Sequence, residues 1–177
     1  MSADEKSGYV DDPPRVNRTL LELVDVSVRF STQAKGWLGK NRFLEAVSHV
    51  SLSVPAGRSL GLVGESGCGK STLARTAVVL NRPYQGRILF GGTDLLKMNP
   101  RNLRRMRRRF QMIFQDPRSS LNPRMKVSKL IAEPLVIHHP DVTAAQRRQK
   151  VSELIELVRL DSSTGTRFPH ELSGGQR

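Results

Sequence analysis

A glycine-rich stretch in the first half of the chain has the residue types and spacing of a phosphate-binding loop. The segment GESGCGKST, residues 64–72, fits the pattern G-x-x-x-x-G-K-[ST] with Gly64, Gly69, Lys70 and Ser71 at the defined positions. Glycines are needed because several backbone N–H groups must converge on one polyphosphate, and side chains would keep the backbone away. An apolar run precedes the loop and a helix-like pattern follows it, as the motif requires. The stretch therefore predicts a site for nucleotide phosphates.

Two side chains of this loop are candidates for roles in catalysis. We expect Lys70 to reach the β- and γ-phosphates of the nucleotide and Ser71 to be a ligand of Mg²⁺. Cys68 is expected to be a small side chain that the loop tolerates, with a reactive thiol at a helix N-terminus as the alternative. The nucleotide-binding residues predicted for the loop are Gly64, Glu65, Ser66, Gly67, Cys68, Gly69, Lys70, Ser71 and Thr72.

A second glycine turn lies near the other end of the chain, in LSGGQ, residues 172–176. A serine followed by two glycines at the start of a helix forms another turn that can receive an anion. One chain seldom needs two such turns for a single phosphate group. Ser173, Gly174, Gly175 and Gln176 are therefore candidates for a second phosphate contact.

The elements that must position the first loop are strands and one helix. The predicted strands are 20–30, 46–54, 59–63, 86–90 and 110–114. The first two alternate apolar and polar residues, and the other three are short apolar runs. The apolar spacing within 70–80 predicts a helix with one buried face. A succession of strand, glycine turn, helix and strand implies an α/β domain with at least one parallel crossover.

The sequence pattern of the second half of the chain predicts helices. Residues 127–137 predict a short helix that is broken at Pro134, and residues 142–160 have apolar side chains at helical spacing, with Thr143 as the N-cap. These helices would form a subdomain inserted between the two glycine turns.

Composition excludes several classes of protein. The 177 residues allow one domain with a real core, and the single cysteine cannot form an internal disulfide. No window reaches the roughly 18 apolar residues of a membrane span, and the first residues lack the apolar region of a secretory signal. None of the four histidines has metal-ligand spacing, so we expect no metal site around them.

The net charge of +13 is concentrated in RNLRRMRRR, residues 101–109, which holds six arginines. Such a run is attracted to nucleic acid or to anionic lipid headgroups, or else forms a solvated helix face beside a buried strand. The solvated face is favoured here, because no aromatic residues interleave with the arginines as they do in single-strand binders.

Two further motifs, together with the glycine turns, resemble those of a known protein family. MIFQDP, residues 112–117, lies between the glycine turns and carries Gln115, and Phe30 ends the first predicted strand. Taken along the chain, Phe30, the glycine loop at 64–72, MIFQDP and LSGGQ resemble four motifs of the ATP-binding cassette (ABC) ATPases. These motifs are the adenine-stacking aromatic, the phosphate loop, the Q-loop and the signature, respectively. The sequences around these motifs, such as FQDPRSSLNPRMKV and PHELSGGQR, are most similar to those of ATPase subunits of bacterial dipeptide and oligopeptide importers. Nickel and glutathione importers are also similar.

The resemblance implies a fold and a division of the chain. The fold class is α/β, a P-loop NTPase of the ABC type, with a mixed sheet, an antiparallel β subdomain and an inserted helical subdomain. Residues 1–19 would be a flexible lead-in, and 20–115 the nucleotide-binding core with its β subdomain. Residues 116–177 would hold the exit of the Q-loop, the helical subdomain and the signature.

The resemblance also implies an ATPase that drives uptake of peptides or a related small solute. ATP and Mg²⁺ would be its cofactors, with Phe30 on the adenine and Gln115 contacting Mg²⁺ and the attacking water. Two such domains meet head to tail in the family, so Ser173, Gly174 and Gly175 would grip the γ-phosphate of a nucleotide held by another chain. Permease subunits would dock on 116–135 at the cytoplasmic face of the membrane, and a solute-binding protein would take part indirectly.

Family members continue past the signature into an aspartate for Mg²⁺, a glutamate that polarises water and a distal histidine, none of which can be placed before Arg177. We therefore expect a chain truncated after the signature and incomplete at its C-terminus, with little turnover alone. Two alternatives stay open. One is a soluble ABC ATPase that acts on nucleic acid or the ribosome, although nucleic acid is not the expected partner. The other is a non-catalytic fragment that occupies a partner's site.

Overall fold

The structure is a computed structural model that describes residues 19–32, 42–116 and 120–177. The chain divides into two compact units, Met1–Leu103 and Arg104–Arg177. Of the lead-in predicted at 1–19, all but Thr19 lies outside the described residues. The domain boundary between 115 and 116 stays a prediction.

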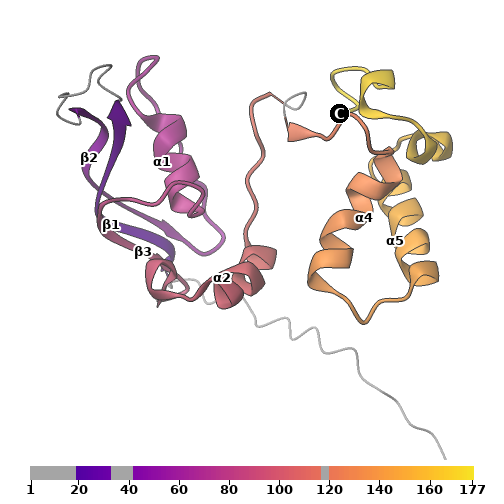
Figure 1. The fold of residues 1–177 in the computed structure, drawn as a ribbon, viewed down its shortest axis with the longest axis horizontal. Helices are drawn as coiled ribbons and strands as arrows, with labels where there is room; N and C mark the ends of the chain where they lie inside the picture. Colours follow the sequence, from indigo (N-terminus) through magenta and orange to yellow (C-terminus); the bar gives the residue numbers. More distant parts are fainter. Residues whose placement is uncertain (1–18, 33–41, 117–119) are drawn as a thin grey trace, which may run out of the picture. The chain divides into compact units, whose positions relative to one another are not determined.

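The first unit is built on a four-stranded sheet with the strand order β2-β1-β3-β4 (Figure 1). Its strands are β1 Thr19–Thr32, β2 Arg42–Pro55, β3 Gln85–Phe90 and β4 Thr93–Asp94. All of the strand pairs are antiparallel, which confirms the antiparallel β subdomain and the strands predicted at 20–30, 46–54 and 86–90. The buried aliphatic side chains of the sheet include Leu23, Val26, Val28, Val47 and Ile88.

Two short apolar runs that we expected to be strands are not strands. Residues 59–63 and 110–114 lie outside any strand, and the sheet of the described residues contains no parallel pair, so the predicted parallel crossover is not found there. Val63 is 98% exposed and Ile113 is 96% exposed. A strand requires a neighbouring strand for its backbone hydrogen bonds, and no described strand pairs with either run. Apolar content predicted both strands without identifying such a neighbour.

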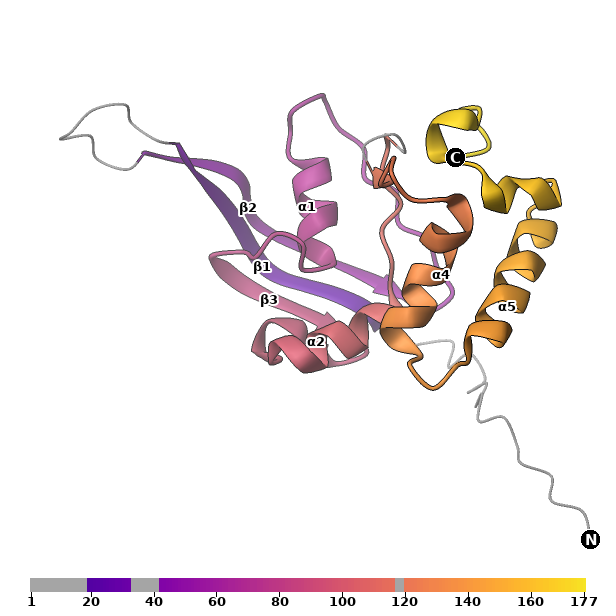
Figure 2. The same cartoon turned by 45° about the vertical axis from the view of Figure 1, so that its right-hand side comes forward.

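Helix α1, Lys70–Ala77, follows the glycine loop and packs against β1 and β2 (Figure 2). Its buried face carries Leu73 and Thr76, and the Thr76 hydroxyl donates to the carbonyl of Thr72 at 2.7 Å, so no polar group is left unsatisfied on that face. The helix ends three residues before the predicted end at 80. Val79 takes a left-handed conformation with φ 54°, which a continuing helix does not allow.

The β1–β2 pair is irregular around Asp25 and His49, which take left-handed backbone conformations with φ of 51° and 48°. The two side chains meet, with His49 Nδ1 2.7 Å from Asp25 Oδ1, and Gln85 Nε2 donates to Asp25 Oδ2 at 2.7 Å. The backbone N–H groups of Asp25 and His49 donate to the hydroxyls of Ser51 and Ser27. Side chains thus replace the strand-to-strand bonds that this bulge interrupts.

This bulge predicts a specific acid dependence of stability. The hydrogen bonds from His49 and Gln85 lower the pKa of the Asp25 carboxyl below its ordinary value. A carboxyl with a depressed folded-state pKa stabilises the fold above its unfolded pKa of about 4, and that stabilisation is lost as the pH falls through the folded value. We expect Asp25→Asn, which tolerates the left-handed conformation, to reduce the loss of stability on acidification. Urea denaturation at a series of pH values measures it.

The matched control for this prediction is Asp141→Asn, at an exposed carboxylate that has no hydrogen-bond partner among the described residues. It should leave the acid dependence of the unfolding free energy unchanged. If both substitutions flatten that dependence equally, the Asp25 cluster has no special part in it.

The elements that follow β4 are helical and include short 3₁₀ helices, labelled η. They are η1 Leu95–Lys97, α2 Pro100–Met106, η2 Arg107–Arg109, α4 Val127–His138, α5 Ala144–Leu157, η3 Ser162–Thr166 and η4 Pro169–Glu171. In the second unit, α4 and α5 lie side by side (Figures 1 and 2). The buried side chains of this unit include Val127, Val151, Ile155 and Leu172.

Both helices predicted for the second half of the chain are present. Thr143 caps α5 as expected, and its hydroxyl and the side chain of Gln146 form a reciprocal capping box. The predicted break at Pro134 is wrong, because α4 continues through it to His138. A proline removes one helical hydrogen bond, which a helix tolerates where the bonds on either side and its packing hold the backbone.

Candidate functional site

The glycine loop ends in the first turn of α1 with backbone N–H groups that the chain itself does not use. Gly69 is the N-cap with φ 93°, and it has no side chain to cap the helix. The first helical bond runs from the N–H of Leu73 to the carbonyl of Gly69 at 2.8 Å. The N–H groups of Lys70, Ser71 and Thr72 therefore have no helical acceptor. Three such donors at the positive end of a helix form a cradle for an anion.

Gly69 is also required by close packing against β2. A Cβ at this position would lie 2.3 Å from the carbonyl oxygen of Ala46 and 3.4 Å from Val47 Cγ2. The loop is therefore held directly against the strand. Ala46 was missed by the sequence analysis, because an alanine in an alternating strand carries no signal of this contact.

We expect Gly69→Ala to destabilise the first unit by about 2 kcal/mol or more, because it combines a left-handed backbone with a steric clash. Gly67→Ala is the matched control. Gly67 is also left-handed, with φ 84°, but its Cβ would meet nothing within 4 Å. That control should therefore cost only about 1 kcal/mol. Thermal or urea unfolding of both variants measures the difference, and equal losses would contradict the contact with Ala46.

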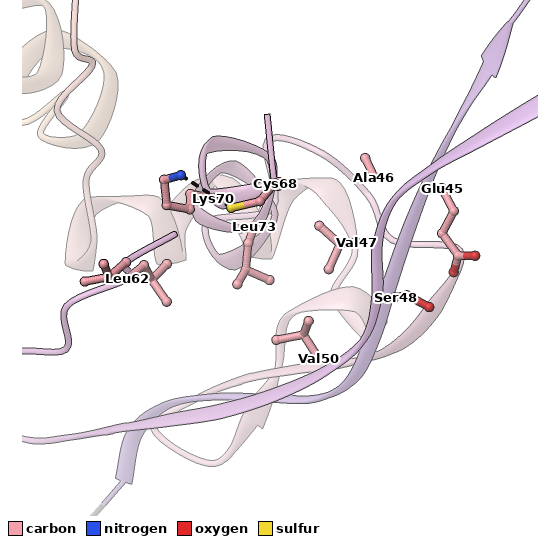
Figure 3. Close-up of a pocket in the computed structure, with 11 residues that line it drawn as sticks. Glu45, Ala46, Val47, Ser48, Val50, Leu62, Cys68, Lys70 and Leu73 are labelled. Atoms are coloured by element: carbon pink, nitrogen blue, oxygen red, sulfur yellow. Dashed lines mark hydrogen bonds between the residues drawn. The ribbon is translucent and has the colours of Figure 1, made fainter. Parts of the chain in front are cut away.

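The Lys70 ammonium lies within the curve of the loop. It donates to the carbonyl oxygens of Gly64 at 2.7 Å and Glu65 at 2.5 Å, and it lies 3.4 Å from Cys68 Sγ. Figure 3 shows the lysine and cysteine side chains next to each other at the start of α1. Cys68 is exposed. The loop therefore presents a cation and an accessible thiol beside the N–H groups of the helix start.

A hollow of about 400 Å³ lies between β2 and the start of α1 (Figure 3). Much of its lining is aliphatic and includes Val47, Val50, Leu62 and Leu73. Aliphatic walls cannot solvate charged phosphates. We therefore assign phosphate binding to the N–H groups and Lys70, and not to the aliphatic part of the hollow.

Phe30 lies in β1, on the strand that pairs with β2. Phe30 is paired with Leu44 across the β1–β2 ladder and is 42% exposed. Leu44 lies two residues before Ala46, whose carbonyl contacts Gly69. Two strand residues span about 7 Å along β2. Contact between the exposed ring and a nucleotide on the loop stays a prediction.

The second glycine turn has a defined internal geometry. The N–H of Ser173 donates to Gln176 Oε1 at 3.0 Å, and the N–H of Gln176 donates back to Ser173 Oγ at 3.4 Å. This reciprocal pair is the arrangement of a helix N-terminus. Leu172 is buried just before the turn, while residues 173–176 are exposed. The turn is thus anchored on one side and open on the other.

The two glycines of this turn are not explained by contacts within the chain. Neither Gly174 nor Gly175 has a left-handed φ, and a Cβ on either would meet nothing within 4 Å. This distinguishes them from Gly69, which the fold itself requires. Glycine at both positions leaves the backbone open to close approach from outside.

Gln115 is exposed and lies outside any helix or strand in the second unit. The loop residues 64–72 and Phe30 belong to the first unit, and their joint action on a nucleotide stays a prediction. Gln115 and the turn at 173–176 belong to the second unit, so their action on a nucleotide stays a prediction. Within the described ranges, no group of three or more histidine, cysteine or acidic side chains converges as a metal site would require. No described helix is long and apolar enough to cross a membrane.

A family model described as "ABC transporter" matches residues 47–177. Among solved structures, a dimeric ATP-binding cassette in a post-hydrolysis state, bound to ADP and Pi, is similar with a TM-score of 0.73. It is 22% identical, and the match covers 89% of this chain and 65% of that one. At this identity, the likeness establishes the cassette fold.

Curated relatives share more of the sequence. The chain is 45% identical to the oligopeptide transport ATP-binding protein AppF of Bacillus subtilis, covering 90% of this chain and 48% of AppF. It is 43% identical to OppF, the oligopeptide transport ATP-binding protein of Escherichia coli, over 90% of this chain and 48% of OppF. It is 38% identical to the dipeptide transport protein DppF of Escherichia coli, over 92% of this chain and 48% of DppF. The chain thus spans about half the length of the curated relatives it matches.

Proposed function

The chain belongs to the ABC transporter family, and on that premise we propose that it is the nucleotide-binding part of an importer subunit for peptides or a related small solute. The observation that carries the nucleotide site is the uncapped start of α1, with three free N–H groups beside the Lys70 ammonium. The identity to oligopeptide and dipeptide transport proteins supports the solute class. The same identity favours an importer over a soluble ATPase that acts on nucleic acid.

ATP and Mg²⁺ fit the chemistry of these residues. The N–H groups at the start of α1 and the Lys70 ammonium would hold the β- and γ-phosphates, and Phe30 would stack on the adenine. The Ser71 hydroxyl is an oxygen ligand of the kind Mg²⁺ accepts, and Gln115 would supply a second oxygen and orient the attacking water. We assign hydrolysis to the whole protein and not to residues 19–177 alone, because this chain spans about half the length of its relatives.

The second glycine turn supports assembly with another cassette. Gly174 and Gly175 are needed neither for backbone conformation nor for packing within the chain. Their openness is accounted for if Ser173 and the two glycines close on the γ-phosphate of a nucleotide held by another subunit. The partner would be a copy of this chain or a related cassette, with permease subunits docked on 116–135 at the cytoplasmic face of the membrane. A solute-binding protein would deliver the solute to the permease.

Alkylation of Cys68 tests the nucleotide site directly, because this is the only cysteine of the chain. Its thiol is exposed and lies 3.4 Å from Lys70 Nζ. We expect saturating MgATP to slow labelling by a maleimide at least about tenfold, since a bound triphosphate covers the loop. Adenosine, which lacks phosphates, should protect little. A labelling rate that MgATP leaves unchanged would place the nucleotide elsewhere.

The solute class has its own test. Cells that depend on this protein should take up radiolabelled oligopeptides or dipeptides. Uptake that persists undiminished when the gene is deleted would rule out the peptide assignment, while leaving the nucleotide site to the alkylation experiment.

A further inference from the structure

A small pocket in the second unit gathers basic and hydrogen-bonding side chains. It lies between η2 and the last turn of α4, has a volume of about 180 Å³, and is separate from the nucleotide loop and from the LSGGQ turn in sequence. Its polar lining consists of Arg107, Arg108, Gln111, His138 and His139, and Pro134 and Leu135 complete it. Nothing in the proposed nucleotide chemistry uses these residues.

The polar groups of this pocket all suit an anion. Two guanidinium groups present N–H forks that match the oxygens of a phosphate, and the imidazoles and the Gln111 amide add further donors. No carboxylate is among its described lining residues. The pocket thus gathers positive charge, and its described lining includes no acidic side chain.

Several arginines at and beside the pocket have no ion pair among the described residues. Arg108 forms no ion pair with any described residue, and neither do Arg104 and Arg105, which precede it in the same arginine-rich segment. These cations therefore attract an external anion with little competition from the protein's own carboxylates.

The end of α4 fixes the position of the two histidines. His138 is the last residue of the helix and His139 is its C-cap, whose N–H donates to the carbonyl of Leu135 at 2.9 Å. Both side chains are half-buried. The carbonyl end of a helix carries about half a negative charge, which is less than the full positive charge of Arg108 alone. The net field at the pocket remains that of an anion site.

We propose that this pocket binds a phosphate group, carried by a soluble phosphate compound or by the headgroup of an anionic phospholipid. The volume sets the ligand size. At roughly 30 Å³ per water it accommodates about six waters, enough for one phosphate group and too little for a nucleotide, whose pockets are typically above about 300 Å³. This site does not depend on the proposed transport function.

NMR of the histidine rings tests the proposal at the site itself. The chain has four histidines, of which His49 and His170 lie outside the pocket. Titration with inorganic phosphate at constant pH and ionic strength should shift the ring signals of His138 and His139 with saturation, and leave those of His49 and His170 unchanged. Uniform drift of all four signals, or no shift, contradicts a phosphate site here.

Paired variants separate a built site from diffuse attraction. Arg107→Gln with Arg108→Gln should weaken phosphate binding by about tenfold or more, since each charged hydrogen bond to an oxyanion is strong. Arg104→Gln with Arg105→Gln removes the same charge from the same segment but leaves the pocket lining intact. It should change the dissociation constant less than about threefold. Equal weakening by both pairs overturns the proposal, and circular dichroism verifies that each variant is folded.

A vesicle arm distinguishes the two sources of the phosphate. The protein is sedimented with vesicles of phosphatidylcholine alone and with vesicles of equal parts phosphatidylcholine and phosphatidylglycerol. Binding to the anionic vesicles that the Arg107 and Arg108 pair of substitutions abolishes, and the control pair does not, assigns the site to a lipid headgroup. Saturable histidine shifts without vesicle binding assign it to a soluble phosphate. Absence of both effects removes the site.

Discussion

Replacing Lys70 with alanine is expected to weaken MgATP binding by about hundredfold and to abolish nucleotide-driven uptake, because two charge-assisted contacts to phosphate oxygens are lost. The ammonium already lies at the centre of the loop, on the carbonyls of Gly64 and Glu65. Calorimetric titration with MgATP measures the binding loss, and uptake of radiolabelled peptide measures the functional loss. The side chain is only half-buried, so the unfolding free energy should change little.

The matched control is Arg75→Ala, which removes one positive charge from the last turn of the same helix. Arg75 is exposed and lies five residues along the helix from Lys70, about 7–8 Å, which is close to the Debye length at physiological salt. Its removal should leave MgATP affinity within about twofold, because exposed charges a Debye length apart interact weakly. If Arg75→Ala weakens binding as much as Lys70→Ala, the effect is one of overall charge, and Lys70 does not bind the phosphates.

The glycine loop could be predicted from sequence because its geometry is local. Gly69 must be glycine for its φ of 93°, and the N–H groups that it leaves uncapped follow from the helix that begins at Lys70. Both features depend only on neighbouring residues, which a motif records. The contact that holds the loop in place, from Gly69 to the carbonyl of Ala46, is between segments distant in the sequence. Residue types alone carry no trace of it.

The strands also depend on contacts between segments that are distant in the sequence, which residue types alone do not specify. Residues 59–63 and 86–90 are both short apolar runs, yet only the second forms a strand, because β3 pairs with β1 over Leu21 to Ser27. The identity of the neighbour decides the outcome, and a run of apolar residues does not specify it. Helix α5 was predictable for the opposite reason, since Thr143 and Gln146 form its cap within one turn. Phe30 is an intermediate case. The family resemblance identified it as a candidate for adenine stacking, and the strand register shows that it lies opposite Leu44 in the β1–β2 pair.

In the whole protein, to which hydrolysis is assigned, Gly175→Asp is expected to reduce ATP turnover by about hundredfold or more, while the protein remains folded and its own loop still binds nucleotide. The new carboxylate would face the γ-phosphate, where a donor N–H is now open to approach. The substitution should cost less than about 0.5 kcal/mol of stability, because the backbone at Gly175 is not left-handed and a Cβ there meets nothing. Ala145→Asp is the control, since it adds the same charge to an exposed position in the first turn of α5. It should leave turnover unchanged.

Mixing two inactive variants of the whole protein tests whether the turn acts on another subunit's nucleotide. In a head-to-tail pair of one Lys70→Ala chain and one Gly175→Asp chain, one site combines an intact loop with an intact turn, and the other site carries both defects. The mixture should therefore regain measurable turnover that neither variant has alone. If each turn served the nucleotide of its own chain, every site in the mixture would carry one defect and no activity would return. The recovered turnover should also rise with the fraction of pairs that contain one chain of each variant. Because the chains associate in closed two-fold pairs, this fraction is largest when the two variants are mixed in equal amounts.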